Sequence, residues 1–393
     1  MKEWKIYKLS EIADIQTGPF GSQLHNNDYV DNGTPIVTVE HLGNRKFSTR
    51  NLPCVSDADK ARLSKYILNE GDIVFSRVGS VDRCSYVSSD EDGWMFSGRC
   101  LRVRCNNMCN PLFLYYYFCK ETIKQYIRSI AVGATMPSIN TKLLSDLPIT
   151  LPSIDVQDKA VQILSRLDDK IELNRQINDN LEQQAQTAFN NIIAQYSECE
   201  TVNLSEIAIL NPKRAIAKGT FARSIEMAQL PTSGSFPAGW DMKEYNGGMK
   251  FQNGDTLMAR ITPCLENGKV AYINFLEENE VAFGSTEYIV ITSKGAIAPE
   301  VFYFLTRHND FVDFAVKNMN GSSGRQRVSA ETIGTYKLPI ISPEDMVILE
   351  TIAKEALNKI KYNSLENIRL SEIRDTLLPK LMSGELEINE IDC

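Results

Sequence analysis

The chain has 393 residues, of which 43% are hydrophobic and 23% are charged, and its formal net charge at pH 7 is -8. This length exceeds what one hydrophobic core normally organises, so we expect two or three domains. No apolar run reaches the roughly 18 residues that a membrane-spanning helix needs. The first residues also lead straight into sequence of folded character, so we expect neither a membrane span nor a signal peptide.

Cysteine usage indicates a reducing compartment. The nine cysteines are odd in number and unevenly scattered. In a chain without a secretion signal, this pattern predicts free thiols and a cytoplasmic location. Cys105 and Cys109 have the spacing C-x3-C, but no second pair of Cys or His lies nearby, so a metal site is not expected there.

The negative charge is concentrated in two stretches. Residues 153–195 contain 4 Lys or Arg and 7 Asp or Glu, and residues 343–393 contain 6 and 11. These stretches carry -3 and -5, which is the whole net charge of -8, so the rest of the chain is balanced. An acidic total therefore does not exclude nucleic acid, and the acidic stretches suit a protein partner as well as solvent.

Residues 1–152 have the pattern of a globular block of short strands, turns and a few helices. The turn Gly71-Asp72 precedes an apolar strand that ends at Arg77. In chain order, we predict a strand at 4–9, a glycine-rich loop at 17–23, strands at 34–39 and 73–75, an apolar helix from Pro111 to about Ile130, and an extended exit at 147–152.

A long helix is predicted at 153–196. Its apolar and Asn positions are spaced 4-3-4-3-4-3-4, which is the seam of a heptad coiled coil. The seam consists of Leu167, Ile171, Asn174, Asn178, Leu181, Ala185, Ala188 and Ile192. Asn at such positions costs stability but fixes register and pairing.

Residues 197–342 repeat the order of the first block. The segment 204–208 copies 9–13, and Gly254-Asp255 leads through a strand to Arg260. Pro299 opens an apolar helix as Pro111 does. The stretches between these matched elements differ freely, so the two blocks share a scaffold but not their loops.

A second long helix is predicted at 343–384, followed by a tail at 385–393. Adding 189 to each number of the first seam gives a second seam, and six of its eight members keep their character. The second seam consists of Ala356, Ile360, Asn363, Asn367, Leu370, Arg374, Leu377 and Leu381. The recurrence of both asparagines indicates an internal duplication with pseudo-twofold symmetry. The fold class is therefore α+β, with two similar mixed α/β domains and two helices that pair lengthwise.

No catalytic constellation is evident. The three histidines are far apart in sequence and lack motif partners. The segment 321–327 is glycine-rich but lacks the Lys-Ser/Thr of a P-loop, and no G-x-G-x-x-G occurs. We therefore expect no catalysis, metal or cofactor on this chain.

Polar and basic side chains gather in loops at the ends of strands and helices. Such residues make phosphate and base-edge contacts with DNA, although each one alone is also compatible with a solvated surface charge. The candidates are Ser22, Gln23, Arg45, Lys46, Arg50, Arg77, Arg260, Asn267, Lys269, Arg325, Gln326 and Arg327.

At this point the pattern resembles a known family, the DNA specificity (S) subunits of Type I restriction-modification systems. The resemblance covers essentially the whole chain. It rests on the duplicated order of lobe and helix, on the Gly-Asp-strand-Arg element in both halves and on Leu-Pro-Ile-x-Leu-Pro before the first helix. The runs 254–269 and 284–288 look like one class of target-recognition domain of this family, and 18–22 looks like another. One departure is that Ile348 stands in the second helix where the first has Gln157.

The resemblance implies target-recognition domains at 1–152 and 197–342, separated by the two helices as an antiparallel coiled coil. Each domain would read one half of a split, asymmetric duplex DNA target. The helices would set the spacer and dock two modification (methyltransferase) subunits, which carry S-adenosylmethionine. Restriction subunits with ATP and magnesium would join outside them. The helix positions implied for pairing and docking are Leu167, Ile171, Asn174, Asn178, Leu181, Ile360, Asn363, Asn367, Leu370 and Leu377.

Two other interpretations stay open at this stage. A non-catalytic coiled-coil adaptor would hold proteins through its two lobes without reading DNA. An enzyme with an unrecognised site is the third hypothesis. Unlike loops on like scaffolds favour the DNA reader, since an adaptor with twofold partners would gain from like loops. Salt-dependent binding to duplex DNA separates the first two interpretations.

Overall fold

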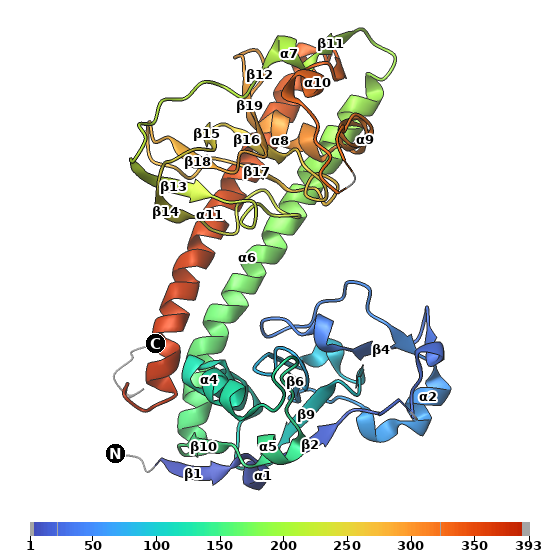
Figure 1. Ribbon diagram of the computed structural model, residues 1–393, viewed down its shortest axis with the longest axis vertical. Coiled ribbons are helices and arrows are strands. Elements are labelled where there is room, and N and C mark those ends of the chain that lie inside the picture. The colour runs from blue at the N-terminus through green and yellow to red at the C-terminus, as the bar shows by residue number, and fades with distance from the viewer. Residues whose placement is uncertain (1–3, 22, 323, 387–393) are drawn as a thin grey trace. The chain divides into compact units, whose positions relative to one another are not determined.

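The computed structural model describes residues 4–21, 23–322 and 324–386 (Figure 1). The predicted contact residue Ser22 and most of the predicted tail at 385–393 lie outside this part of the chain. None of the described helices combines the length and the apolar character that a transmembrane segment needs.

The chain divides into two compact units. Unit 1 consists of residues 1–168 and 371–393, and unit 2 consists of residues 169–370. The division runs through both long helices, so each unit contains a lobe together with parts of both helices. The predicted five-segment division into lobes, helices and tail stays a prediction.

The lobe of unit 1 is built on an antiparallel sheet with the strand order β2-β9-β6-β7. Every residue of β6 is buried. Ile73 and Phe75 contribute to one core and Val74 to another, because successive side chains of a strand point to opposite faces. The strands are β2 (Ala13–Thr17), β9 (Cys100–Cys105), β6 (Ile73–Ser76) and β7 (Cys84–Tyr86).

A second, smaller sheet covers the Val74 side of this strand. Its order is β3-β5-β4-β8, and β4 and β8 run parallel. A short helix, α2, follows β5 and begins at the cap Ser56, whose hydroxyl accepts the backbone N–H of Asp59. These elements are β3 (Tyr29–Val30), β4 (Thr34–Val37), β5 (Cys54–Val55), α2 (Asp57–Arg62) and β8 (Met95–Phe96).

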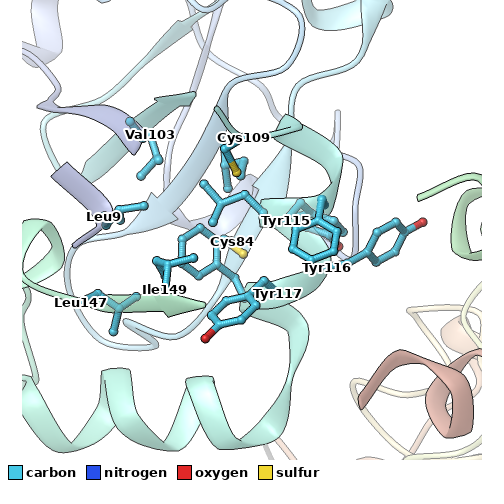
Figure 2. Close-up of a cluster of buried hydrophobic side chains, with 14 of the residues drawn as sticks. Leu9, Cys84, Val103, Cys109, Tyr115, Tyr116, Tyr117, Leu147 and Ile149 are labelled. Atoms are coloured by element: carbon cyan, nitrogen blue, oxygen red, sulfur yellow. The ribbon is translucent and has the colours of Figure 1, made fainter. Parts of the chain in front are cut away.

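Helices cover the other face of the first sheet. The side chain of Asn110 caps α3, and Pro111 occupies the first turn, where a missing N–H costs nothing. Figure 2 shows Leu9, Ile149 and Tyr117 in this core, to which Tyr115 and Tyr116 of α3 also belong. The elements are α3 (Pro111–Cys119), α4 (Glu121–Ile130), α1 (Leu9–Ile12), α5 (Thr141–Ser145) and the strand pair β1 (Lys5–Lys8) and β10 (Pro148–Leu151).

Unit 2 contains a lobe with the same plan. Its antiparallel sheet β12-β19-β16-β17 matches β2-β9-β6-β7 strand for strand, and its second sheet β14-β13-β18-β15 again contains one parallel pair, β13 and β18. The first sheet consists of β12 (Ala208–Leu210), β19 (Tyr288–Ser293), β16 (Thr256–Ala259) and β17 (Val270–Tyr272). The second consists of β14 (Asp241–Glu244), β13 (Phe221–Ile225), β18 (Ala282–Gly284) and β15 (Met249–Phe251).

Helices and one further strand pair complete the lobe of unit 2. They are α7 (Leu204–Ile207), α8 (Glu300–Arg307), α9 (Asn309–Lys317), α10 (Ala330–Gly334) and the pair β11 (Thr201–Asn203) and β20 (Lys337–Pro339). The duplication predicted from sequence is thus present in the order of the elements.

The long helices α6 (Ile154–Gln195) and α11 (Pro343–Leu381) pair in antiparallel fashion. Within unit 2, Asn174 donates to Asn367 Oδ1 at 2.9 Å and Asn363 donates to Asn178 Oδ1 at 2.8 Å. As one residue number rises, its partner's falls, as an antiparallel pair requires. All positions of both predicted seams are buried or half-buried.

The start of α11 shows that Ile348 was matched wrongly with Gln157. Ile149 pairs with Tyr7 in unit 1, and Leu338 pairs with Val202 in unit 2. The offset of 189 between Ile149 and Leu338 makes Met346 the equivalent of Gln157. Ile348 is 50% exposed. The letters Leu-Pro-Ile occur at 147–149 and at 338–340, and matching them gives an offset of 191, which is wrong by two residues.

Gln157 is 1% exposed and links α6 to the start of α3. Its Oε1 accepts the backbone N–H of Asn110 at 2.8 Å, and its Nε2 donates to the carbonyls of Met108 and Pro152. In unit 2, Glu350 instead accepts the N–H of Ala298, which precedes the matching proline. The two units thus satisfy the same backbone group from different turns of their long helices.

Replacing this glutamine tests that contact. Gln157→Leu should lower the free energy of unfolding of the chain by roughly 1–3 kcal/mol, because the backbone groups of Asn110, Met108 and Pro152 lose this partly buried hydrogen-bond partner. Met346→Leu is the matched control, and a volume-conserving change there should cost less than about 1.5 kcal/mol. Urea titration followed by circular dichroism measures both. Equal losses in the two variants would contradict this assignment.

Candidate nucleic-acid interface

In unit 2, three separate segments meet where β16 ends. The backbone N–H of Arg260 donates to the carbonyl of Glu287, and the N–H of Val328 donates to the carbonyl of Arg260, each at 3.0 Å. The N–H of Thr262 donates to Gln326. These bonds place the end of β16, the start of β19 and residues 326–328 next to one another.

The side chains at this junction form a charged cluster. Arg327 donates from Nε and Nη2 to the carboxylate of Glu287 at 2.7–2.9 Å. Arg260 Nε lies 3.6 Å from the same carboxylate, and it is a buried donor without a hydrogen-bond partner among the described residues. Hydrogen bonds from Arg327 lower the pKa of Glu287, so this carboxylate is charged at neutral pH.

The turn that follows Arg260 is held by one arginine of α8. Arg307 donates to the carbonyls of Thr232, Gly234 and Gly268 at 2.8–2.9 Å. Its Nε donates to the hydroxyl of Tyr303, which in turn donates to Glu182 on α6. A continuous set of hydrogen bonds therefore connects α6 with the turn that carries Asn267.

In unit 1, the end of β6 is built in a similar way. The N–H of Arg77 donates to the carbonyl of Arg99, and the N–H of Ile139 donates to the carbonyl of Arg77. The guanidinium of Arg77 lies 5.1 Å from the ring centroid of Phe20 and donates to the carbonyl of Gly98. Arg99 is exposed.

Glycine is required where the Phe20 loop crosses the turn between β8 and β9. A Cβ on Gly18 would lie 2.2 Å from the carbonyl oxygen of Ser97, and one on Gly98 would lie 2.3 Å from that of Pro19. No side chain fits at either position. This close approach holds Phe20 against Arg77.

The aspartates of the two Gly-Asp turns have structural contacts. Asp72 accepts the backbone N–H of Asn69 and pairs with Arg104, and Asp255 accepts that of Gln252 and pairs with Arg214. Asp72 and Asp255 are both almost fully buried. They support the start of β6 and β16 but are not available to a ligand.

The structure brings the predicted residues of unit 2 together around the end of β16. Lys269 ends the turn, and its Nζ donates to the carbonyl of Met227. Asn267 and Arg325 are exposed, and Gln326 and Arg327 are half-buried. These residues and Arg260 line one region of the lobe.

The predicted residues of unit 1 do not form one cluster. The carbonyl of Arg45 accepts the N–H of Tyr86, which pairs with Ile73 at the start of β6, whereas Arg77 follows its end. Arg45 therefore lies at the opposite end of this strand from Arg77. Lys46 is half-buried beside Arg45, and Arg50 is exposed in the same loop.

Gln23 has a structural contact. Its Oε1 accepts the hydroxyl of Tyr66 at 2.7 Å, and its carbonyl accepts Arg62. Neighbouring Ser22 lies outside the described residues. Among the described residues, no group of three His, Cys, Asp or Glu is arranged to hold a metal ion.

Three contributors to these regions were not predicted from sequence: Glu287, Arg99 and Arg307. Glu287 stands in the quoted run 284–288, but only the pairing of β16 with β19 places it beside Arg260. The one sequence signal for Arg99 and Glu287 is that each directly precedes a strand, β9 or β19.

Comparison with known proteins finds that the chain is similar to one kind of protein. Residues 1–183 match a family model described as "Type I restriction modification DNA specificity domain". The chain is 24% identical over 468 aligned positions to the HindI specificity subunit of Haemophilus influenzae, covering 98% of this chain and 100% of that protein. It is 21% identical to the MjaIX specificity subunit of Methanocaldococcus jannaschii, over 99% of this chain and 95% of that protein.

A solved structure has a similar fold. The crystal structure of a Type I restriction-modification system S subunit from M. genitalium superimposes with a TM-score of 0.60 at 17% identity. The match covers 97% of this chain and 96% of that chain. At this level of identity, the likeness concerns the fold alone.

The contacts of Arg307 predict that this side chain stabilises unit 2. Arg307→Ala should lower the free energy of unfolding by about 1.5–3 kcal/mol, because carbonyls bonded to a charged group lose their donor. Arg325→Ala is the control and should change it by less than about 0.5 kcal/mol, since that side chain is exposed. Chemical unfolding of both full-length variants measures the difference. No difference between them would refute a structural role for Arg307.

Proposed function

Because the chain belongs to the family of Type I restriction-modification specificity (S) subunits, we propose that it is the DNA-reading subunit of such a complex. Each lobe reads one half of a split, asymmetric duplex target. The observation that carries this proposal is the duplicated sheet, which keeps its strand order while the side chains at its strand ends differ. Two lobes with the same side chains would suit a symmetric target instead.

The distribution of charge supports this function. The acidic residues that exceed the basic ones lie in the two helical stretches, and the lobes are balanced. Exposed Arg50, Arg99 and Arg325 lie in the lobes, where they suit phosphate contacts. Such contacts fix the position of a protein on duplex DNA, and base contacts then specify the sequence.

The helices have two tasks in this proposal. They hold the lobes at the separation of the two half-sites, and their acidic outer faces dock two modification subunits. The Asn layers support the first task, because a helix pair with a fixed register keeps a fixed length between its ends.

We place all catalysis on partner subunits. The modification subunits supply S-adenosylmethionine and methylate adenine at N6, and restriction subunits supply ATP-dependent cleavage with magnesium. A methyltransferase must turn its target base out of the stack, so this subunit must bind distorted DNA as well. In the proposal the complex acts in the cytoplasm.

Mapping of N6-methyladenine across the genome tests the function. Cells that express this chain with its modification subunit should show one split methylated motif, which should vanish in cells that lack this chain. The purified complex should bind duplex DNA less tightly as salt rises, because phosphate contacts displace counterions. A methylome that is the same with and without the chain, together with no duplex binding, would favour the coiled-coil adaptor.

Shortening both helices by one matched heptad tests the spacer. Removing residues 171–177 and 364–370 deletes facing segments and keeps the layer of Asn178 and Asn363. Seven residues correspond to about 10 Å of helix, or about 3 base pairs, so the mapped spacer should shorten by that amount. Removing 171–177 alone is the control and should lower the melting temperature, because it misaligns the remaining layer. A folded double-deletion variant with the original spacer would contradict the proposed role of the helices.

A further inference from the structure

Three backbone positions at the end of the central strand are equivalent in the two lobes. Arg77 and Arg260 follow β6 and β16. The N–H of each donates to the carbonyl of the residue directly before the neighbouring strand. That residue is Arg99, before β9, in unit 1 and Glu287, before β19, in unit 2. This hydrogen bond, at 2.9 and 3.0 Å, pairs Arg99 with Glu287 as equivalents.

The third position is defined by the same kind of bond. The carbonyls of Arg77 and Arg260 accept the N–H groups of Ile139 and Val328, respectively, so the preceding residues Ser138 and Arg327 correspond. Two further bridges agree with this match. Ser138 pairs with Val78 and Val132, and Arg327 pairs with Ile261 and Asn320.

The two lobes therefore present different side chains from one backbone frame. Unit 1 carries Arg77, Arg99 and Ser138, and unit 2 carries Arg260, Glu287 and Arg327. At the second position the charge is reversed, and at the third a hydroxyl replaces a guanidinium. Two domains that read different sequences need the same backbone arrangement with side chains of different charge.

The unit 2 cluster is accessible and partly unsatisfied. The side chains of Arg260, Glu287 and Arg327 are 30%, 25% and 39% exposed, so a ligand can reach them. Glu287 holds the fork of Arg327 in place, which lowers the entropy lost when that arginine meets a base. The buried Nε of Arg260 has no hydrogen-bond partner among the described residues and lies 3.6 Å from the carboxylate of Glu287.

We propose that Glu287 with Arg327, and Arg99 with Ser138 at the equivalent positions, determine the base sequence that each lobe prefers. This inference rests on the proposed DNA-reading function. In unit 2 the pair matches a G·C base pair, because arginine donates to O6 and N7 of guanine and a carboxylate accepts from N4 of cytosine. In unit 1 the carboxylate is replaced by Arg99, which has no acceptor for cytosine and selects guanine acceptors instead.

Exchange of the side chains between the lobes tests this inference in cells that carry the chain and its modification subunit. The unit 2 variant is Glu287→Arg with Arg327→Ser, and the unit 1 variant is Arg99→Glu with Ser138→Arg. Methylome mapping should show a changed base in one half-site only, that of the altered lobe. Glu278→Arg is the matched control, because it makes the same change of charge at an exposed position of unit 2 and should leave the motif unchanged.

A milder variant covers the case in which an exchange prevents assembly. Glu287→Gln keeps the shape and removes the charge, and the purified complex is titrated with duplexes that differ at each position of the mapped half-site. Discrimination at one G·C position should fall about tenfold, while binding of the other half-site stays the same. Unchanged discrimination at every position would overturn the inference. In that result the wild-type complex still methylates its motif, so the DNA-reading function stands, whereas a wild-type chain that directs no methylation would refute that function itself.

Discussion

Two asparagine layers, each with one buried and one half-buried side chain, fix how α6 and α11 pair. The contacts between these helices and the lobe of unit 2 depend on that register. Asn174 meets Asn367 and Asn178 meets Asn363, while nearer the lobe Phe189 and Ala353 belong to the apolar core. A slip of one heptad along the helices would separate the paired asparagines, place most of them opposite apolar seam residues and leave their donors without partners. The layers thus exclude alternative registers rather than add much stability.

In the lobes, too, the residues that stabilise the fold are separate from those that differ between the two copies. Backbone hydrogen bonds, buried aspartates in the Gly-Asp turns and two apolar cores build the frame, and none of these depends on the side chains at the ends of β6 and β16. Even the partners of the buried aspartates differ, since Asp72 pairs with Arg104 and Asp255 with Arg214. Because the frame is stabilised elsewhere, the residues at the strand ends are free to differ between the lobes. In the proposed function, this freedom lets a duplicated fold read an asymmetric target.

Heptad spacing predicted both long helices and the asparagine pairs, because a coiled-coil seam is a local pattern of one helix face. The order of elements in the duplicated lobes also followed from short repeated segments. The match of Ile348 to Gln157 was wrong, because repeated letters do not report strand register. Glu287 was missed for a related reason: its place beside Arg260 arises from the pairing of strands about thirty residues apart. Local periodicity is visible in one sequence, whereas contacts across a sheet are not.

The mixed charge of the unit 2 cluster has a consequence for recognition. A carboxylate among arginines weakens attraction to phosphates and repels the acceptor-rich edge of guanine, so it reduces affinity for any duplex that does not offer a donor. In unit 1 the same backbone positions carry Arg77 and Arg99 and no carboxylate. These arginines attract every duplex more strongly and repel wrong bases less. In the proposed function, the lobes therefore contribute unequally. Unit 1 supplies more of the affinity that does not depend on sequence, and unit 2 supplies more of the discrimination against wrong bases.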